Sequence, residues 1–181
     1  MAGRNGKNQT VRNMVLSLAV VVPMAGISYL FIPHDSRGME PARTVDYRVE
    51  LDTARRAAPY PVLAPEGLPG TWRATSVTYR VDQRDGKVWH LGFLDPDAQY
   101  VQLEQSDGPS VAFIDDTTQH AEKTGRTQRV GDALWQRYEG PKYNALVRQE
   151  RGVTTVVAGT ASEERLTQMA AALKPGRKTS G

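Results

Sequence analysis

The feature that most constrains this chain is an uncharged apolar run near its start. Residues 14–32 (MVLSLAVVVPMAGISYLFI) are 19 consecutive residues without a charge. At a rise of 1.5 Å per residue, a helix of this length spans about 28 Å, close to the roughly 30 Å thickness of a membrane's hydrocarbon core. The run therefore predicts a transmembrane helix. A buried core helix is the alternative, but the run is too uniformly apolar for a domain of this size.

The charges on either side of the run predict its orientation. Arg4, Lys7 and Arg12 precede it without any acidic residue, whereas the charges that follow are mixed. The positive-inside rule then makes residues 1–13 a basic cytoplasmic tail of a single-pass protein of the cell membrane, with its C-terminal domain outside. A cleaved signal peptide is the rival interpretation. Its apolar region would be shorter and would end in an A-x-A-like site, so we favour an uncleaved anchor.

Composition excludes several classes of protein. The chain has a formal charge of +3 and a pI near 9.3, but residues 44–173 hold 15 basic and 18 acidic residues, so the positive charge lies in the tails. A domain that binds nucleic acid needs its positive charge on a folded face, so we expect no nucleic-acid partner. The chain has no cysteine, which excludes disulfides, thiolate metal sites and a cysteine nucleophile.

The remaining residues divide into a linker, a domain and a tail. Residues 33–43 are polar and contain two prolines, as a juxtamembrane linker does, and residues 174–181 are interpreted as a disordered tail. Between them, residues 44–173 are dominated by a period of two, which indicates half-buried strands. We expect strands at 45–51, 72–81, 88–94, 100–105, 127–130, 133–138, 145–150 and 153–158, the last of them central.

Helices are expected at three places in this domain. Residues 52–58 allow one or two turns before Pro59, and residues 110–117 favour a short helix. The last helix has a cap at Thr160–Ser162, an apolar stripe from Leu166 to Leu173, and a stop at Lys174-Pro175-Gly176. The predicted fold class is α+β: an N-terminal transmembrane helix, then an antiparallel sheet with helices packed on one face.

Aromatic residues recur in the predicted strands. In 88–94, Trp89, Leu91 and Phe93 share one face of the pleat, and the simplest interpretation is that they belong to the core. The functional alternative is an aromatic-lined groove for a lipid, glycan or peptide, formed by Tyr79, Trp89 and Trp135 between the sheet and the final helix.

No pattern in the sequence indicates catalysis. His34, His90 and His120 have no second ligand at a metal-binding spacing, and phosphate-binding, dinucleotide-binding and nucleophile-elbow motifs are absent. Asp115-Asp116 is best interpreted as a helix-end pair. We therefore expect no catalytic, cofactor-binding or metal-binding residues and no cofactor, and we expect that the protein is not an enzyme.

Three segments carry a resemblance to a known family. They are Gly70-Thr71-Trp72-Arg73 after a proline-rich loop, Gly131–Trp135, and Val153–Ser162 before the final helix. With the basic start and the single apolar run, they make the chain similar to the actinobacterial domain-of-unknown-function family numbered 4245. The resemblance implies an uncharacterised, membrane-anchored exterior protein of an actinomycete, and it supplies no known active-site residues.

Together these observations predict a non-enzymatic binding or interaction module of the cell envelope, whose partner is an envelope protein or component. The alternative is a carrier or sensor that holds a lipid, glycan or peptide in a groove between sheet and helix. A hydrolase that uses Asp115 or Asp116 is the least favoured alternative.

Overall fold

The computed structural model describes residues 44–176, and a seven-stranded antiparallel sheet is their main element. Its spatial order is β2-β3-β4-β8-β7-β6-β5, so β2 and β5 are the edge strands and β8 is the middle strand. The bounds are β2 (Arg73–Asp82), β3 (Gly86–Leu94), β4 (Tyr100–Ser106), β5 (Glu122–Val130), β6 (Ala133–Glu139), β7 (Asn144–Glu150) and β8 (Val153–Gly159).

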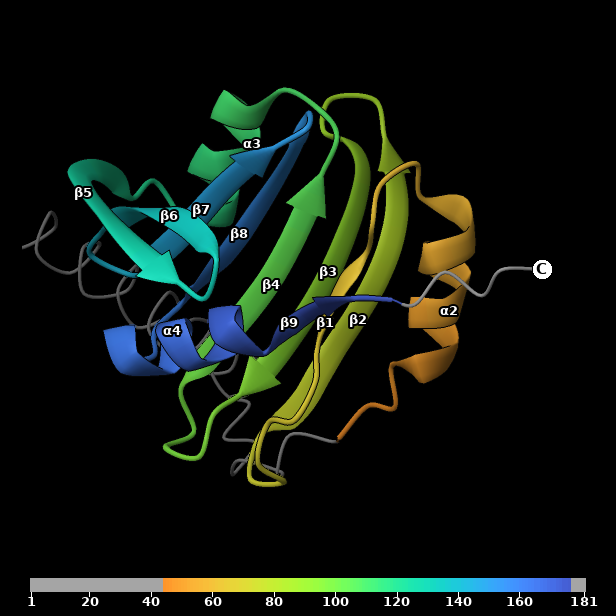
Figure 1. Cartoon of the computed structure of the whole chain (residues 1–181), viewed down its shortest axis with the longest axis horizontal. Helices are drawn as coiled ribbons and strands as arrows, with labels where there is room; N and C mark the ends of the chain where they lie inside the picture. Colours follow the sequence, from red (N-terminus) through yellow and green to blue (C-terminus); the bar gives the residue numbers. More distant parts are fainter. Residues whose placement is uncertain (1–43, 177–181) are drawn as a thin grey trace, which may run out of the picture. The chain divides into compact units, whose positions relative to one another are not determined.

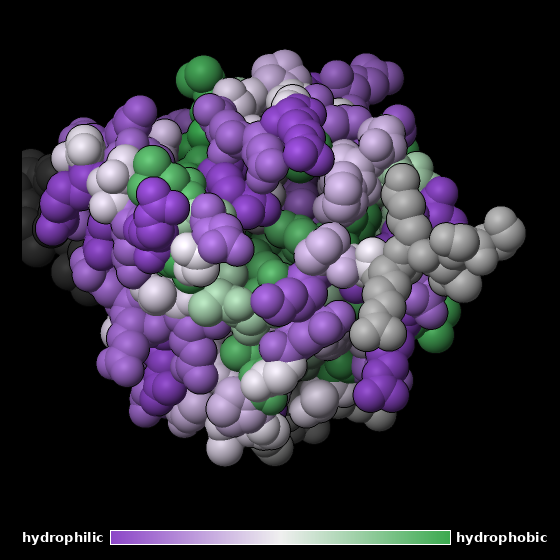
Figure 2. Space-filling model, in the orientation of Figure 1, coloured by the Kyte–Doolittle hydropathy of each residue, from purple (hydrophilic) through white to green (hydrophobic). Residues whose placement is uncertain are grey.

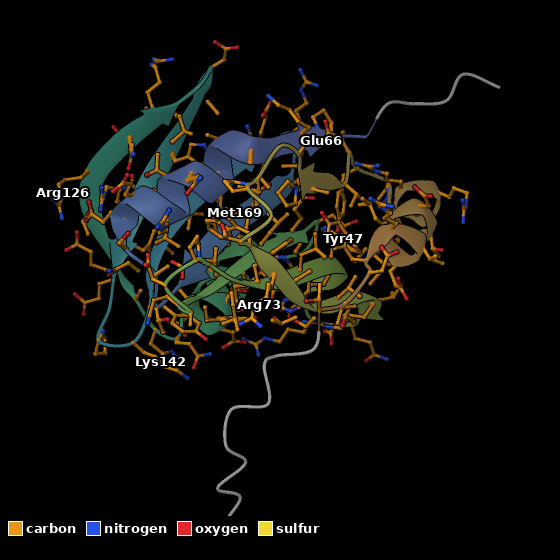
Figure 3. The ribbon with its side chains drawn as sticks, turned by 90° about the horizontal axis from the view of Figure 1, so that it is seen from below. Tyr47, Glu66, Arg73, Arg126, Lys142 and Met169 are labelled. Carbon is orange, nitrogen blue, oxygen red and sulfur yellow. The ribbon has the colours of Figure 1, made fainter. Side chains whose placement is uncertain are left out.

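One face of the sheet carries most of the other elements. Helix α4 (Glu163–Ala172) and the small antiparallel pair of β1 (Leu63–Pro65) and β9 (Leu173–Pro175) lie across it, and α2 (Arg48–Ala57) lies beside β2 (Figure 1). The main core is between these layers. Met169 lies in it, fully buried, between α4 and the sheet (Figure 3).

The other face carries α3 (Ser110–Thr117) and a second, smaller core. Phe113 and Ile114 of α3 pack there against apolar residues of three strands. These residues are Val88 of β3, Ala145 and Val147 of β7, and Val156 and Ala158 of β8. Strand β8 is consequently buried on both faces, since its alternate residues contribute to the two cores. A continuous apolar strand is typical of this position.

The predicted fold class, a transmembrane helix followed by a sheet with helices on one face, is wrong. The described residues are mostly antiparallel sheet with three helices, and α3 packs on the face opposite α4. The apolar run of β8 indicated its central position, but not that a helix would cover each face. Within residues 44–176 no helix has both the length and the apolar character needed to cross a membrane. The predicted membrane segment 14–32, with the flanking 1–13 and 33–43, lies outside the described residues.

The predicted strand at residues 45–51 is also wrong, because α2 begins there. Alternating apolar and charged residues suggested a strand, but Tyr47, Leu51, Ala54 and Ala58 also recur with helical spacing. These four residues face the core, while Val49 is 72% exposed. Burial along the helical stripe therefore outweighed the local alternation.

Other local predictions are confirmed. The turn between Asp82 and Gly86 joins β2 to β3 as a hairpin, with Gly86 at a φ of 73°. Helix α3 has the predicted bounds, β8 is central, and α4 begins after Ser162, whose hydroxyl accepts a hydrogen bond from the Arg165 backbone N–H. The expected disordered tail at 174–181 differs at its start, because Lys174 and Pro175 belong to β9 and pair with β1.

The small β1–β9 pair is joined to the sheet by the side chain of Gln105 on β4. Its Oε1 accepts a 2.7 Å hydrogen bond from the Leu63 backbone N–H, and its Nε2 lies 3.3 Å from the Pro61 carbonyl oxygen. The Trp89 indole N–H adds a 3.0 Å bond to the Leu63 carbonyl oxygen. Gln105 is only 2% exposed, so water cannot replace these bonds.

We expect Gln105→Leu to lower the free energy of unfolding by about 1–3 kcal/mol. The substitution keeps a buried side chain of similar size but leaves the Leu63 N–H without its acceptor. Urea unfolding followed by tryptophan fluorescence measures the change. Gln149→Leu, at an exposed position of β7, is the matched control and should stay within about 0.5 kcal/mol of the parent. Equal effects of the two substitutions would contradict this role of Gln105.

Candidate functional site

A cleft opens where β1 and β9 cross the sheet. Its volume is about 640 Å³, and the residues that give it its character are Tyr60, Leu63, Gln105, Arg148, Thr155 and Leu173. Figure 2 shows apolar atoms gathered at the centre of this face, with hydrophilic atoms around them. The cleft therefore has an apolar interior and a polar rim.

A second cleft lies beside the first, between the β5–β6 turn and the end of α4. Its volume is about 570 Å³, and it shares Arg148, Glu150 and Leu173 with the first cleft. Trp135 and Ala170 also line it. We refer to the two clefts together as the α4 groove. Arg148 is common to both halves of this groove.

The register of the sheet determines where Arg148 lies. Gln105, Thr155 and Arg148 are directly opposite one another on β4, β8 and β7, so all three point to the face that carries α4. The Arg148 guanidinium carbon lies 5.2 Å from the centre of the Trp135 ring, a cation–π contact. Because Trp135 is only 1% exposed, this ring is a fixed support for the guanidinium.

Arg148 is incompletely satisfied by the described residues. Its Nε is buried and has no hydrogen-bond partner among them, and its nearest carboxylate oxygen, on Glu150, is 3.9 Å from Nη1. That distance is too long for a hydrogen bond. The side chain is 25% exposed, so a ligand in the groove can reach it. The arrangement is suited to binding a carboxylate or a phosphate.

Tyr60 is the aromatic residue at the other end of the groove. Its hydroxyl donates a 2.7 Å hydrogen bond to the Lys87 carbonyl oxygen, and the Gln105 carbonyl oxygen is 3.3 Å away. Burial raises the pKa of Tyr60 above its ordinary value, and the nearby Tyr79 adds to the effect. Tyr60 therefore remains a neutral hydrogen-bond donor over the whole physiological pH range.

The three aromatic residues predicted for a groove share a face of the sheet but do not together line the groove. Trp89 is fully buried under β1. Leu91 and Phe93 are buried with it in the core, as the simplest interpretation of the sequence predicts. Tyr79 lies opposite Trp89 on the edge strand β2, away from the residues that line the groove. Trp135 alone of the three lines it.

Residues that the sequence interpretation missed complete the groove. Tyr60 lies in a proline-rich loop, and Arg148 is one of several arginines in polar strand ends, so no motif distinguished them. The signal that was available is the register: if β7 pairs with β8 and β6, Arg148 lies beside Trp135.

The acidic residues considered for catalysis are engaged in surface pairs. Asp115 accepts a 2.8 Å hydrogen bond from His120, and Asp116 is 2.9 Å from Arg84, all with exposed side chains. No group of three potential metal-ligating His, Cys, Asp or Glu side chains occurs among residues 44–176.

Comparison with known proteins gives the chain a family. The family model described as a protein of unknown function (DUF4245) matches residues 7–173. The chain belongs to this family. The predicted resemblance is thereby confirmed, and the matched range of DUF4245 includes Tyr60, Trp135 and Arg148. No curated protein matches the chain.

We expect the stability of this DUF4245 protein to fall as the pH rises above about 10, with a contribution from Tyr60. Above the ordinary tyrosine pKa of 10.0, Tyr60 loses its proton in the unfolded chain but keeps it in the folded one. Unfolding then releases a proton, so higher pH favours the unfolded state. Tyr60→Phe removes this contribution. The free energy of unfolding of the parent should therefore exceed that of Tyr60→Phe by less at pH 11 than at pH 9; we call this difference the stability deficit of the variant.

Urea unfolding at a series of pH values measures this narrowing. Tyr143→Phe is the comparison: burial raises the pKa of Tyr143 less than that of Tyr60, so the stability deficit of this variant should narrow less over the same pH range. A deficit for Tyr60→Phe that stays constant across this pH range would contradict the assignment.

Proposed function

We propose that residues 44–173 form a binding module of the cell envelope, whose α4 groove binds, without chemistry, an amphiphile with a carboxylate or phosphate group. The observation that carries the proposal is Arg148, a guanidinium supported on Trp135, open to both halves of the groove and incompletely paired. This goes further than the sequence, which favours a carrier only as an alternative to binding a protein partner.

The anionic end of the ligand follows from the energetics of Arg148. A buried polar group without a partner costs about 1–3 kcal/mol, and a hydrogen bond to a charged group contributes about 1.5–3 kcal/mol. The planar guanidinium offers parallel N–H groups that match the two oxygens of a carboxylate or phosphate. A ligand with such a group would thus remove a cost that the free protein carries.

The apolar part of the ligand follows from the rest of the lining. Leu63, Val153, Leu173 and Pro175 surround the cleft on the β1–β9 side. Clefts of about 300–1,000 Å³ hold small organic ligands, and both halves of the groove fall in this range. An acyl chain along these residues, with its head group at Arg148, accounts for both the apolar interior and the polar rim.

The lining also favours binding over chemistry. A hydrolytic or transfer site needs a nucleophile hydrogen-bonded to a base, and the side chains that line the α4 groove provide no histidine, serine or cysteine. The one lysine and two arginines of the lining are balanced by three acidic residues, Asp107, Asp132 and Glu150, which does not suit a polyanion such as nucleic acid.

Photo-crosslinking of a fatty acid to the full-length chain tests the proposal. The probe is palmitate with a diazirine in its chain and a terminal alkyne. We expect crosslinks in peptides containing residues 59–65, 148–155 and 173–175. We expect Arg148→Gln to lower the crosslinking yield at subsaturating probe by about tenfold or more, because the charge-assisted hydrogen bond is lost.

Arg151→Gln is the matched control, since Arg151 also borders the groove but is 89% exposed and its side chain reaches only Glu150. Its yield should equal that of the parent. Unlabelled palmitate should compete, whereas hexadecanol, which has no charge, should compete poorly. Crosslinks outside the groove, or equal yields for the two substitutions, would remove the amphiphile proposal.

The location outside the cytoplasm is part of the proposal and has its own test. It is supported by the charge pattern around residues 14–32 and not by the described part of the chain. When protease is added to intact cells whose wall has been removed, it should digest the tag at the C-terminus of the chain. Protection of the tag until lysis would show that the domain faces the cytoplasm.

A further inference from the structure

Ser76, His90 and Glu104 form a continuous hydrogen-bonded chain on the face of the sheet opposite the α4 groove. Ser76 Oγ lies 2.8 Å from His90 Nε2, and His90 Nδ1 lies 3.0 Å from Glu104 Oε1. The histidine and glutamate side chains are 15% and 12% exposed, and Ser76 is half-buried. Nucleophile, base and orienting carboxylate in this order are the arrangement of a serine hydrolase.

The sheet register brings these residues together from three strands. His90 on β3 is directly opposite Thr78 on β2 and Glu104 on β4. Ser76 is two residues from Thr78, so it lies diagonally across from His90 on the same face. Ser76 is directly opposite Gly92 in the same register, and the register of β2 shifts only beyond it, between Ser76 and Ala74.

The carboxylate determines how the proton is arranged along the chain. An ionised Glu104 only accepts hydrogen bonds, so it holds the proton of His90 on Nδ1. In the neutral imidazole, Nε2 then carries a lone pair and can accept the hydrogen bond from the Ser76 hydroxyl. The serine proton is therefore directed at a base before any substrate arrives.

Gly92 and Tyr100 complete the surroundings of Ser76. A Cβ at position 92 would collide with Ser76 Oγ and would lie 2.9 Å from Tyr100 Oη, so both oxygens lie over this glycine. Burial raises the pKa of Tyr100, so its hydroxyl keeps its proton. This hydroxyl donates a 3.2 Å hydrogen bond to Gln102 Oε1 and lies next to the serine oxygen, so a turn of its O–H would direct it at the oxygen where negative charge develops on a substrate.

We propose that Ser76 is the nucleophile of a second site, which hydrolyses carboxylic esters, with His90 as general base, Tyr100 as oxyanion donor and Glu104 as a positioning residue. Esters are the substrate class because an alkoxide leaving group departs more readily than an amine, and this site has one side-chain oxyanion donor. The proposal revises the expectation that the protein is not an enzyme, and it is independent of the α4 groove.

The reaction proceeds in two balanced steps. Ser76 Oγ attacks the carbonyl carbon while His90 Nε2 takes the hydroxyl proton. The bond to the leaving oxygen then breaks, and His90 gives that oxygen its proton, which leaves an acyl group on Ser76. Water, the co-reactant, then attacks the acyl carbon. Its proton passes through His90 to the departing Ser76 Oγ, and the carboxylic acid is released.

A fluorophosphonate probe tests the nucleophile directly on the purified full-length chain. Attack by Ser76 Oγ forms an oxygen–phosphorus bond, expels fluoride and leaves the probe on the serine, where peptide mass spectrometry locates it. We expect labelling at Ser76, and its loss in Ser76→Ala. The labelling rate of His90→Gln should fall at least about a hundredfold, the size of a general-base contribution. Unlabelled parent protein, or labelling that survives Ser76→Ala, would overturn the proposal.

Two further comparisons separate catalysis from a structural role. Thr78→Ala is the matched control, because Thr78 faces His90 across the strands but its hydroxyl bonds the Val77 carbonyl oxygen. The fluorophosphonate should label Ser76 of this variant at the parent rate. With p-nitrophenyl acetate, Glu104→Gln should lower kcat and leave KM unchanged, since Gln keeps the size but not the charge that fixes the histidine proton. An unchanged kcat would show that the carboxylate does not position His90.

The two sites can fail separately. In Arg148→Gln the fluorophosphonate should label Ser76 at the parent rate, because Arg148 points to the other face of the sheet. Ser76→Ala should in turn leave crosslinking of the palmitate probe unchanged.

Discussion

The side chain of Gln105 connects the two layers on the α4 side of this domain. It extends from the middle of the sheet and replaces the backbone partners that the short strand β1 lacks on that side, so β1 and its partner β9 stay above the sheet. The α4 groove exists because this pair is held there. Tyr60, which bonds the Lys87 carbonyl oxygen, fixes the preceding loop in the same way. A buried amide and a buried phenol thus determine the shape of the groove.

Sequence patterns predicted the elements better than their arrangement. The Asp-Gly turn, the capped and striped α4 and the apolar β8 all carry local signals, and each is present as predicted. Helical turns were expected at 52–58, but the first residues of α2 were assigned to a strand, because residues 45–51 satisfy both a period of two and a helical stripe and only packing against the core distinguishes them. The position of α3 on the opposite face depends on contacts with strands distant in sequence. Strand β9 has three residues, two of them in a segment with a helix-stop composition.

The candidate sites were harder to predict, because each is made by register. Trp135 was identified as an aromatic residue of a groove, but its partner Arg148 is on the next strand and shares no motif with it. Ser76, His90 and Glu104 are each separated by 14 residues, a spacing that matches no known signature. Counting outward from the Asp85-Gly86 turn would have placed His90 opposite Thr78. The same count places Ser76 opposite Gly92, since the register shifts only between Ser76 and Ala74, farther from the turn.

The pairing of β1 with β9 joins segments from opposite ends of the domain through three residue pairs. A pulling force on the chain beyond residue 176 reaches β9 before any strand of the large sheet. Three residue pairs resist such a load far less than the seven-stranded sheet does. Tension would therefore detach β9 and open the α4 groove while the rest of the domain stays folded. The same feature that covers the groove makes it responsive to mechanical load.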